Sequence, residues 1–296
     1  MNRLTCIETG AGLSSRELID KQAVDGCTKI TALIFEGDKI REEYQWGFHL
    51  IGYSQGGLIA RWLFMKCDKV RPYVATISTN GSPNLGVEKI PSPTDFGPSK
   101  KEEGWSFKKV GLWFADAATS LTDYFAKMST DGKFWSFTQY LYKKESNNTL
   151  KLTNFLKELN ESPTVKYDQL ELYNGILYLD ERVVTPRSSS AFGIDYLENG
   201  WPSLTNIPNA SRFGFDTLIK QKRLIFCAAQ FHHLALTSAE YSDFHILTGD
   251  GCSAPKEGMP VAEVRALYKE CSALKFKYNP LNNLKCTGTM ARRLVI

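Results

Sequence analysis

Short apolar runs rich in β-branched and aromatic residues alternate along the chain with stretches of helical spacing. This alternation is typical of an α/β fold built around a mostly parallel sheet flanked by helices. Each apolar run is bounded by glycine or polar residues, as the strands of such a sheet are. A buried helix is predicted at 58–65, where the apolar residues are spaced to face a sheet. The predicted strands are 3–7, 48–52, 73–78, 175–179 and 223–228.

Two segments depart from this alternation. Prolines at 91, 93 and 98 mark a loop that leaves the sheet, and residues 105–159 combine helical spacing with many aromatic side chains. We interpret 92–165 as a helical insertion over the active site, above the carboxyl ends of the strands, where α/β proteins bind ligands. Such an aromatic array is more often an ordinary core than a ligand pocket, although its position above the strand ends reduces that preference. We expect one domain over 1–251, and a tail over 252–296 whose role is unassigned beyond a predicted helix at 261–274.

Composition narrows the classes of partner. The net charge is +4 over 296 residues and the basic residues are scattered, so no nucleic acid is expected. No apolar run approaches the ~18–20 residues of a transmembrane helix, so no membrane span is expected. The seven cysteines show no CxxC spacing, which argues against a metal site.

The sequence gives conflicting indications of the cellular compartment. Cys252, Cys271 and Cys286 gather near the end of the chain, which favours an oxidising environment. The first residues, by contrast, lack the apolar stretch of a secretory signal. Four Asn-x-Ser/Thr sequons, which also arise by chance, are present at Asn80, Asn147, Asn160 and Asn209.

The strongest chemical signal is the sequence Gly-Tyr-Ser-Gln-Gly-Gly at 52–57. A Gly-x-Ser-x-Gly motif between a strand and a helix predicts a nucleophile elbow, with Ser54 as the nucleophile. Glycine is needed at 52 and 56 because side chains there would collide with the neighbouring backbone. The turn also aims the amide of Gln55 at the oxyanion that develops during acyl transfer.

A serine nucleophile needs a base and an acid, which in this fold follow it in the order acid, then base. Of the four histidines, His233 is favoured as the base because it follows the last predicted strand after a short loop. His232 is then a loop residue, His49 a packed or edge residue within a strand, and His245 an outside candidate. The acid is expected after the strand 175–179, where either Asp180 or Glu181 could orient the imidazole.

Taken together, these motifs resemble the palmitoyl-protein thioesterase family of α/β-hydrolases. The similarity covers most of residues 4–245 in the same order, and the Ser-Gln-Gly-Gly elbow is its most specific part. Further matches are the segment 6–10, the strand and loop 77–86, the Val-Val-Thr-Pro run ending at Pro186, the segment 191–193 and the motif 233–237.

The resemblance implies an enzyme that removes palmitate and other long-chain acyl groups from cysteine thioesters. Its partners would be S-palmitoylated proteins and fatty acyl thioesters, and it would need no metal or other cofactor. The acyl chain would lie in an apolar groove under the insertion. Family members are typically lysosomal or secreted glycoproteins, so disulfides and glycans are expected. A lipase or carboxylesterase on the same fold, or an inactive acyl-binding protein, are the alternatives.

The chain departs from the family pattern in three places. Family members begin with an additional strand, which lies between the strand ending at Ile7 and the one ending at Gly52 and supplies the second oxyanion donor. No such strand is recognisable here, so we expect a truncated N-terminus and a gap in the sheet. Thr185 stands where animal members carry their acid, whereas a plant-like pattern points to Glu181, ranked above Asp180. The tail after Gly251 extends past the usual end of the family.

Overall fold

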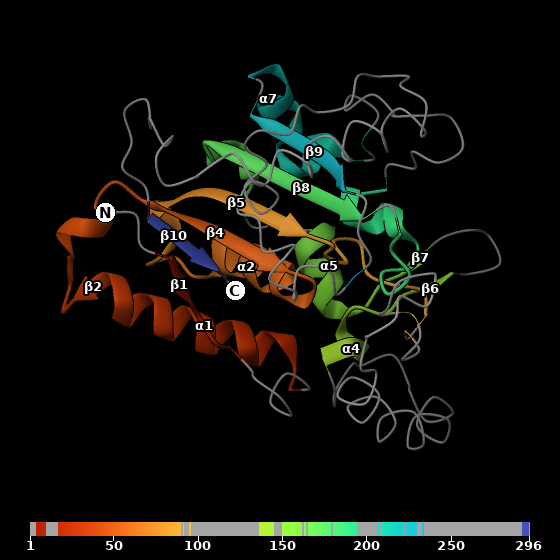
Figure 1. The fold of residues 1–296 in the computed structure, drawn as a ribbon, viewed down its shortest axis with the longest axis horizontal. Helices are drawn as coiled ribbons and strands as arrows, with labels where there is room; N and C mark the ends of the chain where they lie inside the picture. Colours follow the sequence, from red (N-terminus) through yellow and green to blue (C-terminus); the bar gives the residue numbers. More distant parts are fainter. Residues whose placement is uncertain are drawn as a thin grey trace, which may run out of the picture.

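A parallel sheet forms the centre of the molecule (Figure 1). The structure, a computed structural model, describes residues 4–9, 17–89, 91, 95, 136–144, 150–161, 163, 165–178, 180–193, 207, 209–221, 223–229, 233 and 292–295. In the described residues the sheet has six strands in the order β1-β10-β4-β5-β8-β9, and every neighbouring pair is parallel. The fold class expected from the sequence, an α/β fold of the hydrolase type, is confirmed.

The predicted strands lie within one to three residues of the observed ones. They are β1 (Leu4–Cys6), β4 (Phe48–Tyr53), β5 (Val74–Asn80), β8 (Leu172–Tyr178) and β9 (Leu224–Ala229). Strands β4, β5 and β8 are almost wholly buried, which explains why they read as apolar runs rather than as alternating patterns.

The expected gap in the sheet is absent. Strand β10 (Arg292–Val295) lies between β1 and β4 and pairs with both, with Leu294 opposite Leu50 and Arg293 opposite Leu4. The prediction of a gap was therefore wrong, because the unassigned tail supplies a strand at this position. A long-range pairing of this kind leaves no signal in the local sequence pattern.

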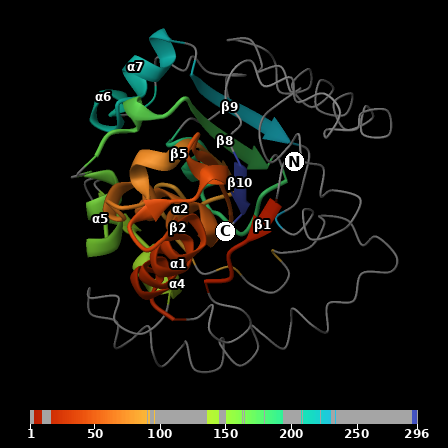
Figure 2. The same ribbon diagram turned by 90° about the vertical axis from the view of Figure 1, so that its left-hand side faces the viewer.

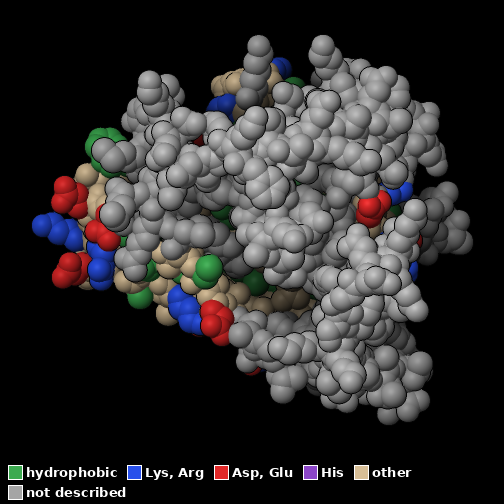
Figure 3. Space-filling view, viewed as in Figure 1, with side chains coloured by type: hydrophobic (Ala, Val, Ile, Leu, Met, Phe, Trp, Pro, Cys, Tyr) green, Lys and Arg blue, Asp and Glu red, His purple; other side chains and the backbone are tan. Residues whose placement is uncertain are grey.

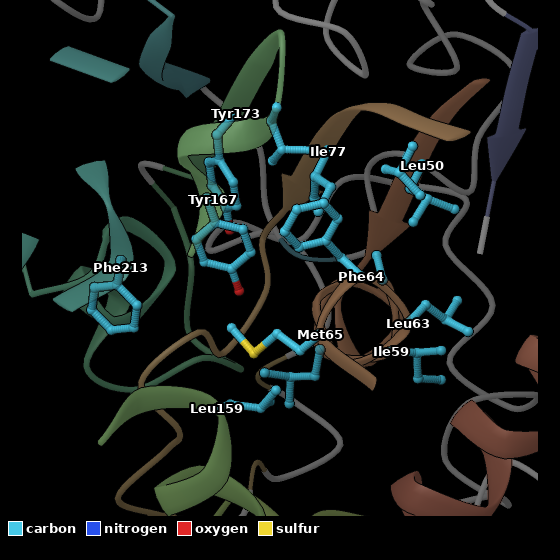
Figure 4. Close-up of a cluster of buried hydrophobic side chains, with 14 of the residues drawn as sticks. Leu50, Ile59, Leu63, Phe64, Met65, Ile77, Leu159, Tyr167, Tyr173 and Phe213 are labelled. Carbon is cyan, nitrogen blue, oxygen red and sulfur yellow. The ribbon is translucent and has the colours of Figure 1, made fainter. Parts of the chain in front are cut away.

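Helix α2 (Gln55–Lys66) extends the predicted helix 58–65 and packs on β4 and β5. Helix α1 (Ile19–Ile34), which the sequence pattern did not single out, packs against α2. The short helices α6 (Ala210–Phe213) and α7 (Phe215–Lys220) precede β9. Figure 2 shows these described helices on one side of the sheet. Figure 4 shows Leu63 and Phe64 of α2 within the core they share with Leu50 and Ile77 of the sheet.

The described part of the predicted insertion 92–165 is not purely helical. It contains α4 (Ser136–Gln139), α5 (Asn154–Asn160) and an antiparallel pair of short strands, β6 (Lys143–Lys144) and β7 (Leu150–Lys151). Most of the aromatic stretch, and the helix predicted at 261–274, lie outside the described residues. The boundaries of the insertion stay predictions. A small hairpin, β2 (Phe35–Glu36) and β3 (Lys39–Ile40), follows α1.

A disulfide joins Cys27 of α1 to Cys67 at the end of α2. It links α1 covalently to α2, the helix that packs on the sheet. On the face drawn in Figure 3, acidic and basic side chains of the described residues are interspersed. Ion pairs among the described residues include Lys29–Asp25 at 2.7 Å and Lys69–Asp38 at 3.0 Å. None of the helices in the described ranges is long and apolar enough to cross a bilayer.

Candidate active site

Ser54 occupies the sharp turn between β4 and α2. Its φ of 51° and ψ of −124° are rarely adopted by residues other than glycine, and such backbone strain is a feature of functional sites. A hydrogen bond of 2.8 Å from the Ser54 amide to the carbonyl of Asn80 ties the turn to the end of β5. A Cβ atom on Gly52 would lie 2.4 Å from the carbonyl oxygen of Gly56, so the turn requires glycine at that position.

Ser54, His233 and Glu181 form a continuous hydrogen-bonded chain. The imidazole Nε2 of His233 lies 2.8 Å from the Ser54 Oγ, and its Nδ1 lies 2.7 Å from the Glu181 Oε2. The three residues come from the carboxyl ends of β4, β8 and β9, which meet at one edge of the parallel sheet. His233 and Glu181 are buried. This arrangement matches a serine nucleophile, its general base and the acid that orients the base.

The Glu181 carboxylate is held in place from its other side. Its Oε1 accepts hydrogen bonds from the amides of Val183 and Val184, at 2.7 and 3.0 Å. One oxygen is thereby fixed to the backbone while the other faces His233. Asp180 lies half-buried in the same turn, and Thr185 donates to the Arg182 carbonyl at 3.1 Å. Of the two acids predicted, the structure therefore brings Glu181 to the histidine.

The remaining predicted residues are placed as follows. Gln55 is the first residue of α2, where backbone amides of the first turn point out of the helix along its positive end. Its side-chain Nε2 donates to the Gln22 Oε1 at 3.0 Å, which ties the elbow to α1. His49 lies on β4 with its Nδ1 2.6 Å from the Thr76 Oγ1, a packed position as predicted. His232 and His245 lie outside the described residues.

Two tyrosines flank His233. The sequence analysis did not predict a role for either of them. The Tyr53 ring lies 5.4 Å from the His233 ring, and the Tyr178 ring lies 6.5 Å from it. Burial raises the pKa of both phenols well above the usual value, and the charge of Glu181 adds to the effect. Both side chains are therefore neutral at physiological pH. Of the two, Tyr53 could have been singled out from the sequence as a residue close to the site, because it lies inside the elbow motif.

A groove of about 660 Å³ opens on the helical side of the molecule, between α1, α2 and α5. Trp62 and Phe155 contribute to its lining, whereas Ser54, His233 and Glu181 do not. It is thus separate from these three residues, and the predicted acyl groove stays a prediction. In the described part of the chain, no cluster of three or more His, Cys, Asp or Glu side chains could hold a metal ion.

Two of the sequon asparagines are buried. Asn80 and Asn160 are 0% and 4% exposed, and Asn160 donates to the Asn84 carbonyl at 3.0 Å. Neither side chain can carry a glycan in this fold. Asn209 is exposed, and Asn147 lies outside the described residues.

Comparison with known proteins identifies related sequences. A family model described as Palmitoyl protein thioesterase matches residues 5–233, a stretch that contains Ser54, Glu181 and His233. A curated relative from Schizosaccharomyces pombe (strain 972 / ATCC 24843), the Palmitoyl-protein thioesterase-dolichyl pyrophosphate phosphatase fusion 1, is 30% identical over 153 residues. The aligned region covers 50% of this chain and 22% of that relative.

Proposed function

Since this chain belongs to the palmitoyl protein thioesterase family, we propose that it hydrolyses thioesters between long-chain fatty acids, chiefly palmitate, and protein cysteines. The observation that carries the proposal is the hydrogen-bonded chain from Ser54 through His233 to Glu181. The substrates would be S-palmitoylated proteins or peptides, and the reaction needs no cofactor.

The proposed reaction has two acyl-transfer steps. His233 takes the proton of the Ser54 hydroxyl as the Oγ attacks the thioester carbonyl, and the Gln55 amide stabilises the oxyanion. The carbon–sulfur bond then breaks, and the cysteine thiolate leaves with the proton from the imidazolium. In the second step His233 removes a proton from water, which attacks the acyl-serine. Fatty acid departs and Ser54 regains its proton.

Glu181 supports both steps by orienting the imidazole and by stabilising its protonated form. Its attachment to the Val183 and Val184 amides keeps the carboxylate in place while the charge on His233 changes. The proposal assigns no proton transfer to Glu181 itself.

The decisive test is palmitate release from a palmitoyl-cysteine thioester by the unaltered protein and by its Ser54→Ala variant. We expect hydrolysis by the unaltered protein, and a loss in the variant of roughly 10⁶-fold, since removing the nucleophile leaves only binding and oxyanion stabilisation. Equal rates in the two proteins would contradict the assignment of Ser54.

Two alternatives give different outcomes. A lipase or carboxylesterase on this fold would cleave the oxygen ester of palmitate faster than the matching thioester. An acyl-binding protein without catalysis would retain a palmitoyl probe but would not react covalently with a serine-directed fluorophosphonate. The aligned Ser54 and His233 favour catalysis over mere binding, and the family match favours thioesters over oxygen esters.

A lysosomal or secreted location is part of the proposal. The Cys27–Cys67 disulfide supports it, because such bonds persist in oxidising compartments. Imaging of the tagged protein beside a lysosomal marker tests the location, and diffuse cytosolic signal would contradict it.

A further inference from the structure

His233 is held at its main chain as well as at its ring. The ring contacts Ser54 through Nε2 and Glu181 through Nδ1. The Tyr53 hydroxyl donates a hydrogen bond to the backbone carbonyl of His233. Tyr53 and Ser54 are consecutive residues, so β4 and its elbow contact the base at two separate points.

We propose that Tyr53 is a positioning residue, whose hydroxyl fixes the His233 main chain so that the imidazole stays within reach of the Ser54 hydroxyl. This rests on the proposed function. The hydroxyl contacts the backbone carbonyl of His233, and the effect of Tyr53 on catalysis is exerted through His233.

The geometry explains why such an anchor matters. His233 lies beyond the end of β9, the edge strand of the described sheet, whereas Ser54 follows β4 near its centre. The hydrogen bond from the Tyr53 hydroxyl ties the base directly to the strand that carries the nucleophile. A displacement of about 1 Å in an active site can lower a rate about 10²-fold, so the loss of an anchor at this point should lower the rate.

The chemical state of Tyr53 suits this task. Burial and the nearby Glu181 charge raise the pKa of its phenol well above the usual value, so the hydroxyl keeps its proton and remains a donor throughout the working pH range. The ring also packs against the imidazole at 5.4 Å between centroids, tilted by 37°. Phenylalanine would preserve this packing and remove only the hydrogen bond.

The test is the Tyr53→Phe variant, with Tyr173→Phe as its matched control. Tyr173 is also buried, and its hydroxyl lies 3.4 Å from the Thr79 Oγ1, within the core of the fold. We expect Tyr53→Phe to lower kcat about 5- to 10-fold with KM unchanged, the loss expected when one hydrogen bond that positions the base is removed. Tyr173→Phe should leave kcat unchanged. Thermal melting of both variants shows whether the fold is retained.

A double-variant cycle separates positioning from a structural role. In a His233→Ala background, the Tyr53→Phe change should have no further effect on the residual rate, because there is no imidazole to position. An additional loss of the same size in that background would overturn the proposal. So would an unchanged kcat in Tyr53→Phe alone, or an equal loss in Tyr173→Phe.

The rate of Ser54 labelling by a fluorophosphonate keeps this test independent of the acyl substrate. If the unaltered protein is labelled but does not cleave palmitoyl thioesters, the proposed substrate fails while the positioning role is still measured. Slower labelling of Tyr53→Phe supports that role, and labelling at the unaltered rate overturns it. Absence of labelling in the unaltered protein would overturn both proposals.

Discussion

At the scale of single residues, the turn after β8 distinguishes between two neighbouring acids. Glu181 has one carboxylate oxygen on the His233 ring and the other on the amides of Val183 and Val184. A carboxylate bound at both oxygens keeps one orientation, which is what a residue that orients an imidazole needs. Asp180 lies half-buried one position earlier in the chain.

The two acids should respond differently to removal of their charge. We expect Glu181→Gln to lower kcat roughly 10³- to 10⁴-fold, because an amide in place of the acid favours the wrong imidazole tautomer. Asp180→Asn should retain nearly full activity. Steady-state kinetics on a palmitoyl thioester, with melting curves for both variants, give the comparison. A larger loss in Asp180→Asn would assign the acid to Asp180 instead.

Most of this residue arrangement could be predicted from local sequence. Ser54 lies in a recognisable motif, and His233 and Glu181 follow apolar runs in the order expected for this fold. Their catalytic roles stay predictions. The contact between Tyr53 and His233 could not be predicted, since the two residues are 180 positions apart in sequence and a tyrosine before the serine is equally suited to simple packing.

At the scale of elements, α2 is joined to the rest of the fold through a buried arginine. Arg61 is 0% exposed and donates to the Asn84 carbonyl at 2.6 Å, to the Asn160 Oδ1 at 2.7 Å and to the Leu159 carbonyl at 3.1 Å. Two of these acceptors lie at the carboxyl end of α5, where backbone carbonyls attract cations. The guanidinium also lies 4.8 Å from the centre of the Phe192 ring.

Replacing this arginine should destabilise the fold strongly. Arg61→Met has similar length but removes the donors to the buried Leu159 carbonyl and Asn160 Oδ1, so we expect a loss of about 3 kcal/mol or more in the free energy of unfolding. Arg61→Lys keeps the charge but lacks the planar set of donors, and we expect an intermediate loss. Denaturant titration measures both. A loss below about 1 kcal/mol for Arg61→Met would show that the network contributes little.

Elements differ in how clearly the sequence predicts them. Helix α2 was predicted because large apolar side chains mark its buried face. Helix α1 was not predicted, although Ile19, Ala23, Ile30 and Ile34 recur at helical spacing; its buried face also includes Gln22 and Gly26, which are not large apolar residues. The close approach at Gly26 is to the segment after β1, because an added Cβ there would meet the Thr9 side chain at 3.0 Å, whereas Leu63 of α2, at 3.8 Å, would be an ordinary contact.

At the scale of the whole molecule, continuity of the sheet depends on β10. Its backbone pairs with β1 on one side and β4 on the other, so it joins the β1 edge to the strand that leads to Ser54. The sequence predicted the parallel sheet but not this strand, because the identity of a pairing partner is decided by contacts between distant segments. The local hydrophobic pattern does not indicate these long-range contacts.

A proline within β10 should weaken the sheet. We expect Leu294→Pro, in the interior of the strand, to lower the free energy of unfolding by about 1–3 kcal/mol, since proline removes a ladder hydrogen bond and leaves its acceptor on the neighbouring strand unpaired. The control is Arg292→Pro, because proline is tolerated at the first residue of a strand. Equal stability of Leu294→Pro and the unaltered protein in urea would contradict the placement of β10.

The position of β10 also sets the order in which the protein can be completed during synthesis. Leu294 pairs with Leu50, a residue made roughly 240 positions earlier. At ribosomal speeds of about 5–20 residues per second, roughly 10–50 s separate the two. Throughout that interval the facing edges of β1 and β4 lack their partner, and unpaired strand edges attract strands of other chains. Strand edges of neighbouring nascent chains on one messenger RNA can therefore pair with one another until residues 292–295 of each chain emerge.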